Sequence, residues 1–244
     1  MRNRRAAIIA GLVPMVAAAA LLAGHHKAEP LGVRPPGARP QLLLLTSLPL
    51  LLPEGFSLKG KQVPVTARLK QRYVIKPIAL ADRASLAGAR LLFMAHPRAQ
   101  TAEALVDLDR WVRGGGRVLL LADPRLDWPS ERPLGDRLRP PPGFADTGLL
   151  AHWGLSLEAP TVQGAVAVEL DGRSLTLSSP GRLAGKACVL AAERTVARCA
   201  IGRGKATIIA DADLLDPALS GERIADNLDA VMAELDQLEV PSAH

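Results

Sequence analysis

The sequence predicts an open, mostly parallel α/β sheet flanked by helices, and three observations lead to this fold class. First, residues 105–113 place apolar side chains at helical spacing, and three glycines then end the helix. Second, the short apolar run 118–122 follows without alternation, which is typical of a strand buried on both faces. Third, similar runs recur at 41–45, 89–95 and 206–210. Helices alternating with such strands are typical of a parallel α/β sheet.

This pattern divides the first half of the chain into strands and helices. In chain order we expect a strand that begins at Gln41 and ends at Thr46 and Ser47, a loop at 48–60, a short helix at 63–71, a strand at 73–78 and a strand at 89–95 that ends at His96. Pro77 indicates that the second strand lies at the edge of the sheet, because proline cannot donate to a strand ladder.

The central helix has clear start and stop signals. Thr101 is a good N-cap, and Glu103 lies in the first turn, where the helix dipole favours a negative charge. Gly114, Gly115 and Gly116 end the helix, since glycine accepts the left-handed conformation that other residues resist.

The second half of the chain is less regular. Residues 123–144 are too long for an ordinary connection and predict either a lid or an ordered surface excursion packed by Trp128. Residues 162–201 alternate between apolar and polar with turns between, which predicts an antiparallel β-meander that extends the sheet. The remaining expected elements are a short helix at 146–153, an extended segment at 154–157, a strand at 206–210 ending at Asp211 and Asp213, a loop at 214–220 and a helix at 224–238.

Length and composition favour one domain plus an anchor, and a protein that does not bind nucleic acid. The chain has 244 residues, 48% of them hydrophobic, which is enough to bury one full core. The net charge is +6, but no basic cluster is interleaved with aromatics, and aromatics make up only 3% of the chain. Stacking platforms for bases are therefore not expected.

The N-terminus predicts a membrane anchor. Arg2, Arg4 and Arg5 precede the uncharged stretch 6–24, which as a helix would rise about 28 Å, close to the thickness of the hydrocarbon core of a bilayer. The alternative is a cleaved signal peptide, although its small-residue cleavage pattern is poorly matched. By the positive-inside tendency, a single span at 1–24 in the inner (cytoplasmic) membrane places the domain 41–244 in the periplasm, behind a proline-rich tether at 25–40.

The two cysteines fit an oxidising compartment. Cys188 and Cys199 flank a predicted two-residue hairpin turn at Glu193-Arg194, and counting outward along the register sets them opposite each other. Cross-strand neighbours are close enough for a disulfide after modest adjustment. The alternative is two buried free thiols.

Polar residues gather where the parallel strands end, which is where open α/β sheets bind ligands. This set comprises Thr46, Ser47, His96, Asp123, Asp211 and Asp213. Three interpretations stay open. Ser47 could attack a substrate while His96 takes its proton and Asp123 orients the imidazole, although Ser47 lacks the G-x-S-x-G elbow. Alternatively, the aspartates could hold a hard cation, or all of these residues could simply cap helices and end strands. The last interpretation, with no cofactor and no metal, is preferred.

The glycine-containing stretch 202–205 is not expected to cradle phosphate. A phosphate loop follows a strand and precedes a helix, whereas these glycines precede a strand. The sequence therefore predicts a hairpin turn here.

Two segments carry a resemblance to a known family. The stretch WVRGGGRVLLLADP at 111–124 resembles the helix-turn-strand of the class I glutamine amidotransferase-like fold, which is flavodoxin-like. Together with GKATIIADAD at 204–213 and Asn227, it is similar to the non-catalytic branch found in the gliding-motility auxiliary component of ABC transporters. The two segments cover about a quarter of the domain.

The resemblance implies a domain without amidotransferase chemistry. In the catalytic branch the strand after the glycines ends in a Gly-x-Cys-x-Gly elbow, and that cysteine falls at Ala122 in this chain. The catalytic His-x-Glu is replaced by Asp211-Ala212-Asp213. The family then implies an accessory or binding subunit that accompanies an ABC permease and ATPase, and a Ser/His/Asp hydrolase is the alternative function.

Overall fold

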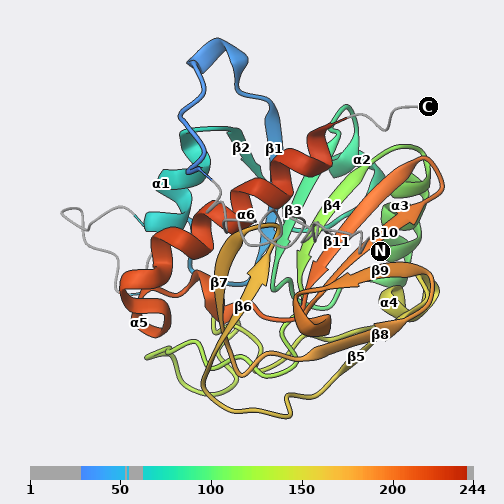
Figure 1. Cartoon of the computed structure of the whole chain (residues 1–244). Coiled ribbons are helices and arrows are strands. Elements are labelled where there is room, and N and C mark those ends of the chain that lie inside the picture. The colour runs from blue at the N-terminus through green and yellow to red at the C-terminus, as the bar shows by residue number, and fades with distance from the viewer. Residues whose placement is uncertain (1–28, 53, 55–62, 241–244) are drawn as a thin grey trace, which may run out of the picture.

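A mostly parallel seven-stranded sheet forms the centre of the protein. The computed structural model describes residues 29–52, 54 and 63–240. Within them the strand order is β2-β1-β3-β4-β11-β10-β9 (Figure 1). The strands are β1 Gln41–Thr46, β2 Val74–Pro77, β3 Leu91–Ala95, β4 Arg117–Leu121, β9 Cys188–Ala191, β10 Val196–Ile201 and β11 Gly204–Ile209. The first five in spatial order are parallel, and β10 and β9 continue the sheet as an antiparallel hairpin.

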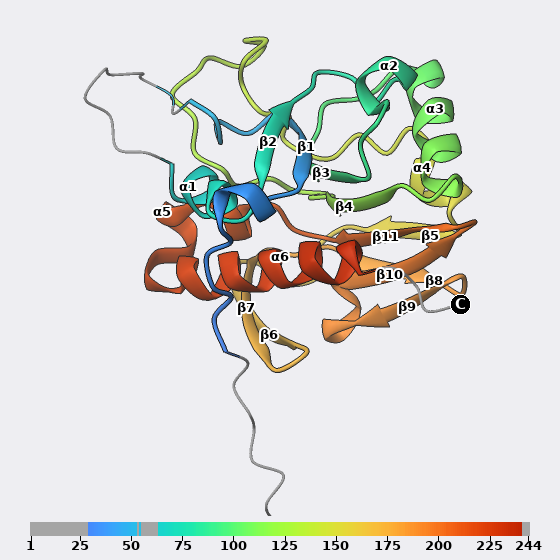
Figure 2. The same cartoon turned by 90° about the horizontal axis from the view of Figure 1, so that it is seen from above.

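Helices cover both faces of this sheet, as Figure 2 shows. The helices α1 Pro64–Lys70 and α6 Ile224–Glu239 lie on one face, with the short α5 Pro217–Ser220 before α6, and α2 Arg83–Leu86, α3 Ala102–Arg113 and α4 Leu149–His152 lie on the other. Successive residues of β1 face opposite layers, so that Leu42 and Leu44 join the core under α6 while Leu43 and Leu45 join the core under α3. The predicted mixed α/β class with a mostly parallel sheet is therefore confirmed, and Pro77 lies on the edge strand β2.

The α3 helix and the strand after it follow the predicted signals. The Thr101 side chain accepts a hydrogen bond from the Ala104 N–H, and the helix ends at Gly114. The turn between β10 and β11 packs against this helix end, where a Cβ atom on Gly204 would lie 2.0 Å from the Val112 carbonyl oxygen and 2.2 Å from that of Gly116. Only glycine fits this approach, so the hairpin turn at 202–205 has a packing role.

The predicted β-meander is wrong in its connectivity. Strands β6 Ala165–Leu170 and β7 Arg173–Ser178 form a separate hairpin, and β8 Arg182–Gly185 pairs with β5 Leu155–Glu158 outside the central sheet. Only β9 and β10 extend that sheet. The reason is packing, because the apolar side chains of the β6–β7 hairpin are buried in the core under α6. The hairpin therefore covers a face of the sheet and does not lengthen its edge.

The hairpin β9–β10 carries the predicted cysteine pair. Cys188 lies opposite Cys199 in the register, and a disulfide joins them with a Cα–Cα distance of 4.4 Å. The turn between the strands is closed by a hydrogen bond from the Thr195 N–H to the Ala192 carbonyl oxygen, 2.9 Å. Its residues Glu193 and Arg194 have φ angles of 54° and 71°, as a type I′ turn requires.

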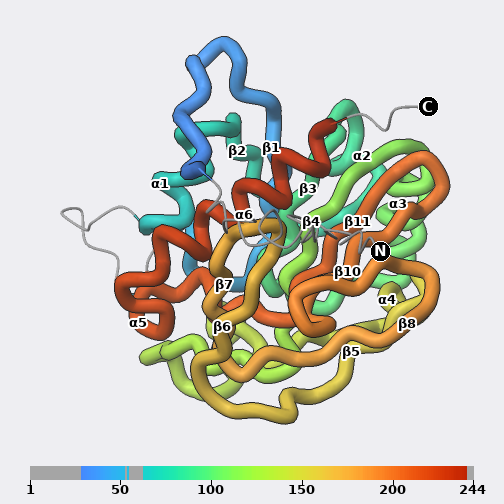
Figure 3. The backbone as a smooth tube through the Cα atoms, in the orientation of Figure 1, coloured from blue at the N-terminus to red at the C-terminus, as the bar shows by residue number. Residues whose placement is uncertain are grey.

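The part of the predicted tether that the structure describes is docked on the domain. Arg34 forms ion pairs with Asp236 and Glu239 of α6, at 2.8 and 2.9 Å, and its guanidinium lies 5.0 Å from the centre of the Tyr73 ring. Arg68 of α1 donates to the Leu31 carbonyl oxygen, 2.6 Å. Residues 29–40 therefore run as a strap beside α1 and α6 (Figure 3, blue), and they do not hang free as an extended linker.

The long connection 123–144 is an ordered excursion. Its base is closed by a hydrogen bond from the Phe144 N–H to the Asp123 carbonyl oxygen, 2.6 Å, and Leu126 and Trp128 pack against the core under α6. Trp128 therefore has the packing role that the sequence suggests.

No helix of the described part of the chain is both long and apolar enough to cross a membrane. The predicted anchor at 1–24 lies outside the described residues, as do residues 25–28 of the tether.

Candidate functional site at the strand ends

The predicted polar residues lie together at the carboxyl ends of the parallel strands. The hydroxyl groups of Thr46 and Ser47, however, donate hydrogen bonds to backbone carbonyl oxygens. The Thr46 hydroxyl donates to the Ala95 carbonyl oxygen, 2.8 Å. The Ser47 hydroxyl donates to the carbonyl oxygen of His96, not to its imidazole. Both side chains thus fasten the end of β1 to the end of β3.

His96 is fully buried with its imidazole turned to the 123–144 excursion. Its Nε2 lies 3.0 Å from the Pro141 carbonyl oxygen, and since a carbonyl can only accept, Nε2 carries the proton. The Nδ1 atom has no partner among the described residues. Burial lowers the pKa of the imidazole, so the ring is neutral at pH 7. The hydroxyl–imidazole contact that a catalytic triad requires is therefore not formed.

Asp123 links two loops through its buried carboxylate. Oδ1 accepts the N–H of Arg125 and Oδ2 accepts the N–H of Ala212, each at 2.8 Å. Burial raises the pKa of this carboxyl group to about 6, although the backbone donors work in the opposite direction. Asp123 does not hydrogen bond His96, so it does not orient the imidazole as the hydrolase hypothesis requires.

Asp211 and Asp213 have the same role at the end of β11. The carboxylate of Asp211 accepts the N–H groups of Ser178 and Leu214, at 2.5 and 2.7 Å. Asp213 Oδ2 accepts the N–H of Asp127 at 2.7 Å, while its Oδ1 has no partner among the described residues. Burial raises both pKa values, that of Asp213 to about 7.

These contacts support the capping interpretation of the strand-end residues. Three buried carboxylates bind backbone N–H groups and thereby hold together the loops that follow β4, β7 and β11. Within the described ranges, no group of three His, Cys, Asp or Glu side chains is placed to hold a metal ion. The cation site considered from the sequence is therefore not assembled there.

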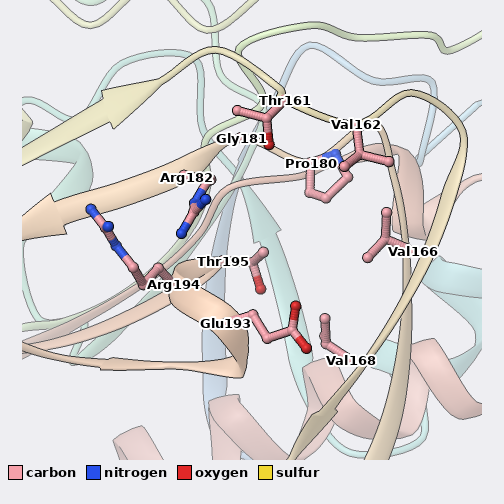
Figure 4. A pocket seen from close by; sticks show the side chains of 10 residues that line it. All are labelled: Thr161, Val162, Val166, Val168, Pro180, Gly181, Arg182, Glu193, Arg194 and Thr195. Carbon is pink, nitrogen blue, oxygen red and sulfur yellow. The ribbon is translucent and has the colours of Figure 1, made fainter.

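A cavity of about 420 Å³ lies beside the end of β11, between the β6–β7 hairpin and the β9–β10 turn (Figure 4). Its wall includes Val166 and Val168 of β6, Arg182 of β8, and Glu193 and Thr195 of the turn. Sequence reasoning missed this site because its residues come from strands whose pairing it mispredicted. The one available signal was the Glu193-Arg194 turn, which occupies positions that normally carry Asn and Gly.

The comparisons with known proteins inform the fold only. No protein-family model matches the chain, and no curated protein matches it. Among solved structures, the chain is similar to the mmIFT52 N-terminal domain, with 17% identity, a TM-score of 0.54, and coverage of 84% of this chain and 99% of that one.

Two glycosidase structures also match, at lower TM-scores. They are the exo-β-1,4-mannosidase Op5Man5 from Opitutaceae bacterium strain TAV5, with 12% identity over 81% of this chain and a TM-score of 0.49, and the GH42 β-galactosidase Gan42B, with 18% identity over 84% and a TM-score of 0.46. The chain spans only 36% and 31% of the lengths of these enzymes.

Proposed function

We propose that this protein is a non-catalytic accessory or binding subunit of an ABC-type transport or envelope system. In this proposal residues 6–24 anchor it in the inner membrane, and the domain, of the class I glutamine amidotransferase-like type, faces the periplasm. Its partners there are a permease and an ATPase.

The observation that carries the proposal is the end of β4. At the position where the catalytic branch of the family has its cysteine, this chain has Ala122, which is fully buried. The next residue, Asp123, uses both carboxylate oxygens to hold backbone N–H groups. A side chain committed in this way stabilises the loops and is not free to act on a substrate.

A further finding supports the proposal. The disulfide between Cys188 and Cys199 favours an oxidising compartment such as the periplasm.

The test is recovery of the tagged full-length chain from solubilised membranes of its native host. We expect it in the membrane fraction, with its cysteines protected from alkylation, and we expect a permease and an ATPase to enrich with it after mild cross-linking. The matched control replaces residues 1–24 with a cleavable signal peptide, so that the domain is exported without an anchor and loses the enrichment. A partner-free monomer with two alkylatable cysteines would contradict the proposal.

A further inference from the structure

The cavity between the β6–β7 hairpin and the β9–β10 turn has the composition of a ligand site. We propose that it binds a small zwitterion with an aliphatic part, of the amino-acid or short-peptide class. The inference goes beyond the proposed function, since it requires neither a membrane anchor nor an ABC partner.

The polar side of the cavity carries a positive and a negative side chain, and neither forms an ion pair within the described part of the chain. The Nε atom of Arg182 is buried without a hydrogen-bond partner among the described residues. The carboxylate of Glu193, also on the wall, forms no hydrogen bond or ion pair within the described chain. In Figure 4 the two side chains lie to either side of Thr195. Arg194 also lines the cavity, but its Nε donates to the Leu183 carbonyl oxygen and Figure 4 shows its guanidinium turned away from Glu193. The remaining guanidinium and the carboxylate match a ligand that carries a carboxylate and an ammonium group.

The opposite side of the cavity is apolar. Val166 and Val168 project from one face of β6, and Val162 and Pro180 complete this wall. Val168 is only 7% exposed and belongs to the core, so this wall is firmly held. The volume of about 420 Å³ lies within the range of small-molecule sites, which are mostly apolar with a few placed polar groups.

The turn that carries Glu193 is strained and rigidly supported. Ala192, Glu193 and Arg194 all adopt left-handed φ angles, of 46°, 54° and 71°. Residues other than glycine and asparagine resist this backbone conformation. The disulfide and the strand register below fix this hairpin, and Arg194 Nε donates to the Leu183 carbonyl oxygen at 3.0 Å. Strain of this kind gathers at binding sites, where it holds a side chain in place before the ligand arrives.

A zwitterion fits better than a ligand with one charge. A ligand with only a negative charge would pair with Arg182 but would lie beside the like charge of Glu193. A ligand with only a positive charge would pair with Glu193 but would lie beside the like charge of Arg182. Since a charged group left unpaired beside a bound ligand loses hydration without compensation, both charges of the ligand should contribute to its affinity.

The test uses the full-length protein in detergent and isothermal titration with L-leucyl-L-leucine as the probe. N-acetyl-leucyl-leucine lacks the ammonium group, and leucyl-leucine amide lacks the carboxylate. We expect the unmodified dipeptide to bind about tenfold more tightly than either derivative.

Two variants assign each charge to its partner. Glu193→Gln should remove the preference over the N-acetyl derivative and keep the preference over the amide, whereas Arg182→Gln should do the reverse. Controls are Glu169→Gln and Arg90→Gln, which remove exposed charges outside the cavity and should leave all three affinities unchanged.

Equal binding of the three probes, or no binding at millimolar concentration, would overturn the inference. Thermal unfolding of each variant checks that it is folded, and Arg182→Met, which removes the charge but keeps a long side chain, replaces Arg182→Gln if that variant fails. Because titration does not depend on membrane partners, its failure is distinguishable from failure of the proposed function.

Discussion

The buried aspartates at the strand ends make the stability of this protein depend on pH. Burial raises the pKa of Asp123 to about 6 and that of Asp213 to about 7, both from an ordinary value of 3.8. The folded state therefore binds protons more tightly than the unfolded state between these limits. It follows that the contribution of these groups to the free energy of unfolding is most favourable at low pH and falls as the pH rises from about 4 to 7.

Substituting Asp213→Asn should reduce this pH dependence. The amide keeps an oxygen for the Asp127 N–H and removes the negative charge of a carboxylate whose Oδ1 has no partner in the described part of the chain. We expect the difference in unfolding free energy between about pH 4.5 and about pH 7.5 to shrink by about 1 to 3 kcal/mol, as measured by urea denaturation. Glu169→Gln, at an exposed site, is the control. An unchanged pH profile would show that Asp213 is not the responsible group.

The sequence could place these polar residues at the strand ends but could not predict their hydrogen-bond partners. The shared edge of Asp123 and Asp211 was predictable, because both directly follow parallel strands. Their partners were not, since Asp211 bonds Ser178, 33 positions away, through a hairpin whose location depends on packing. His96 likewise bonds Pro141 in a connection that has no periodic pattern.

Among the elements, the junction between α3 and the β10–β11 turn leaves no room for a side chain at Gly204. Its missing Cβ would meet backbone oxygens of Val112 and Gly116, and backbone cannot turn aside as a flexible side chain can. We expect Gly204→Ala to cost about 2 to 3 kcal/mol of unfolding free energy, measured by chemical denaturation. Gly37→Ala should be nearly neutral, because no atom of the described residues lies within 4 Å of the added Cβ.

The β9–β10 hairpin should depend on its disulfide. The bridge closes a loop with a sequence separation of 11, so replacing both Cys188 and Cys199 by alanine should lower the unfolding free energy by about 2 to 3 kcal/mol. Thermal unfolding with and without reductant measures this loss, and the double variant should not respond to reductant. Intact protein from an oxidising compartment that carries two free thiols would contradict the assignment.

Caps and turns predicted the helices and strands well where these local sequence signals were strong. The Thr101 cap and the glycines fix α3 within the sequence itself, and the turn at 193–194 sets the register of Cys188 against Cys199. The failure at β6–β8 has a different origin. Alternation identifies strands but not their neighbours, and the neighbours of β6 and β7 follow from burial under α6.

In the molecule as a whole, the strap 29–40 is held mainly by Arg34. Arg34→Met should release the ion pairs to Asp236 and Glu239 while keeping apolar contact with Tyr73. We expect faster hydrogen exchange at the Arg34 amide, which donates to the Gln71 carbonyl oxygen, and a loss of about 1 kcal/mol in stability. Arg90→Met, at an exposed position, is the control, and unchanged exchange in the strap would contradict this role.

The architecture was the most predictable feature, since it needs only the order of helices and buried strands. The strap was not predictable in the same way. Proline-rich segments without periodicity are usually linkers, and Arg34, which docks this one, finds its carboxylates on α6, 202 and 205 positions away along the chain.

The docked strap sets how far the domain could stand from a bilayer. A free segment from 25 to 40 could extend about 55 Å, whereas only residues 25–28 remain between the proposed anchor and the strap, and these reach about 14 Å at most. A connecting segment of this length would keep the domain close to the lipid headgroups and would restrict the orientations that the domain can adopt. A partner would then have to bind the domain beside the membrane surface. Residues inserted into segment 25–28 would weaken this binding without altering any contact between the two proteins.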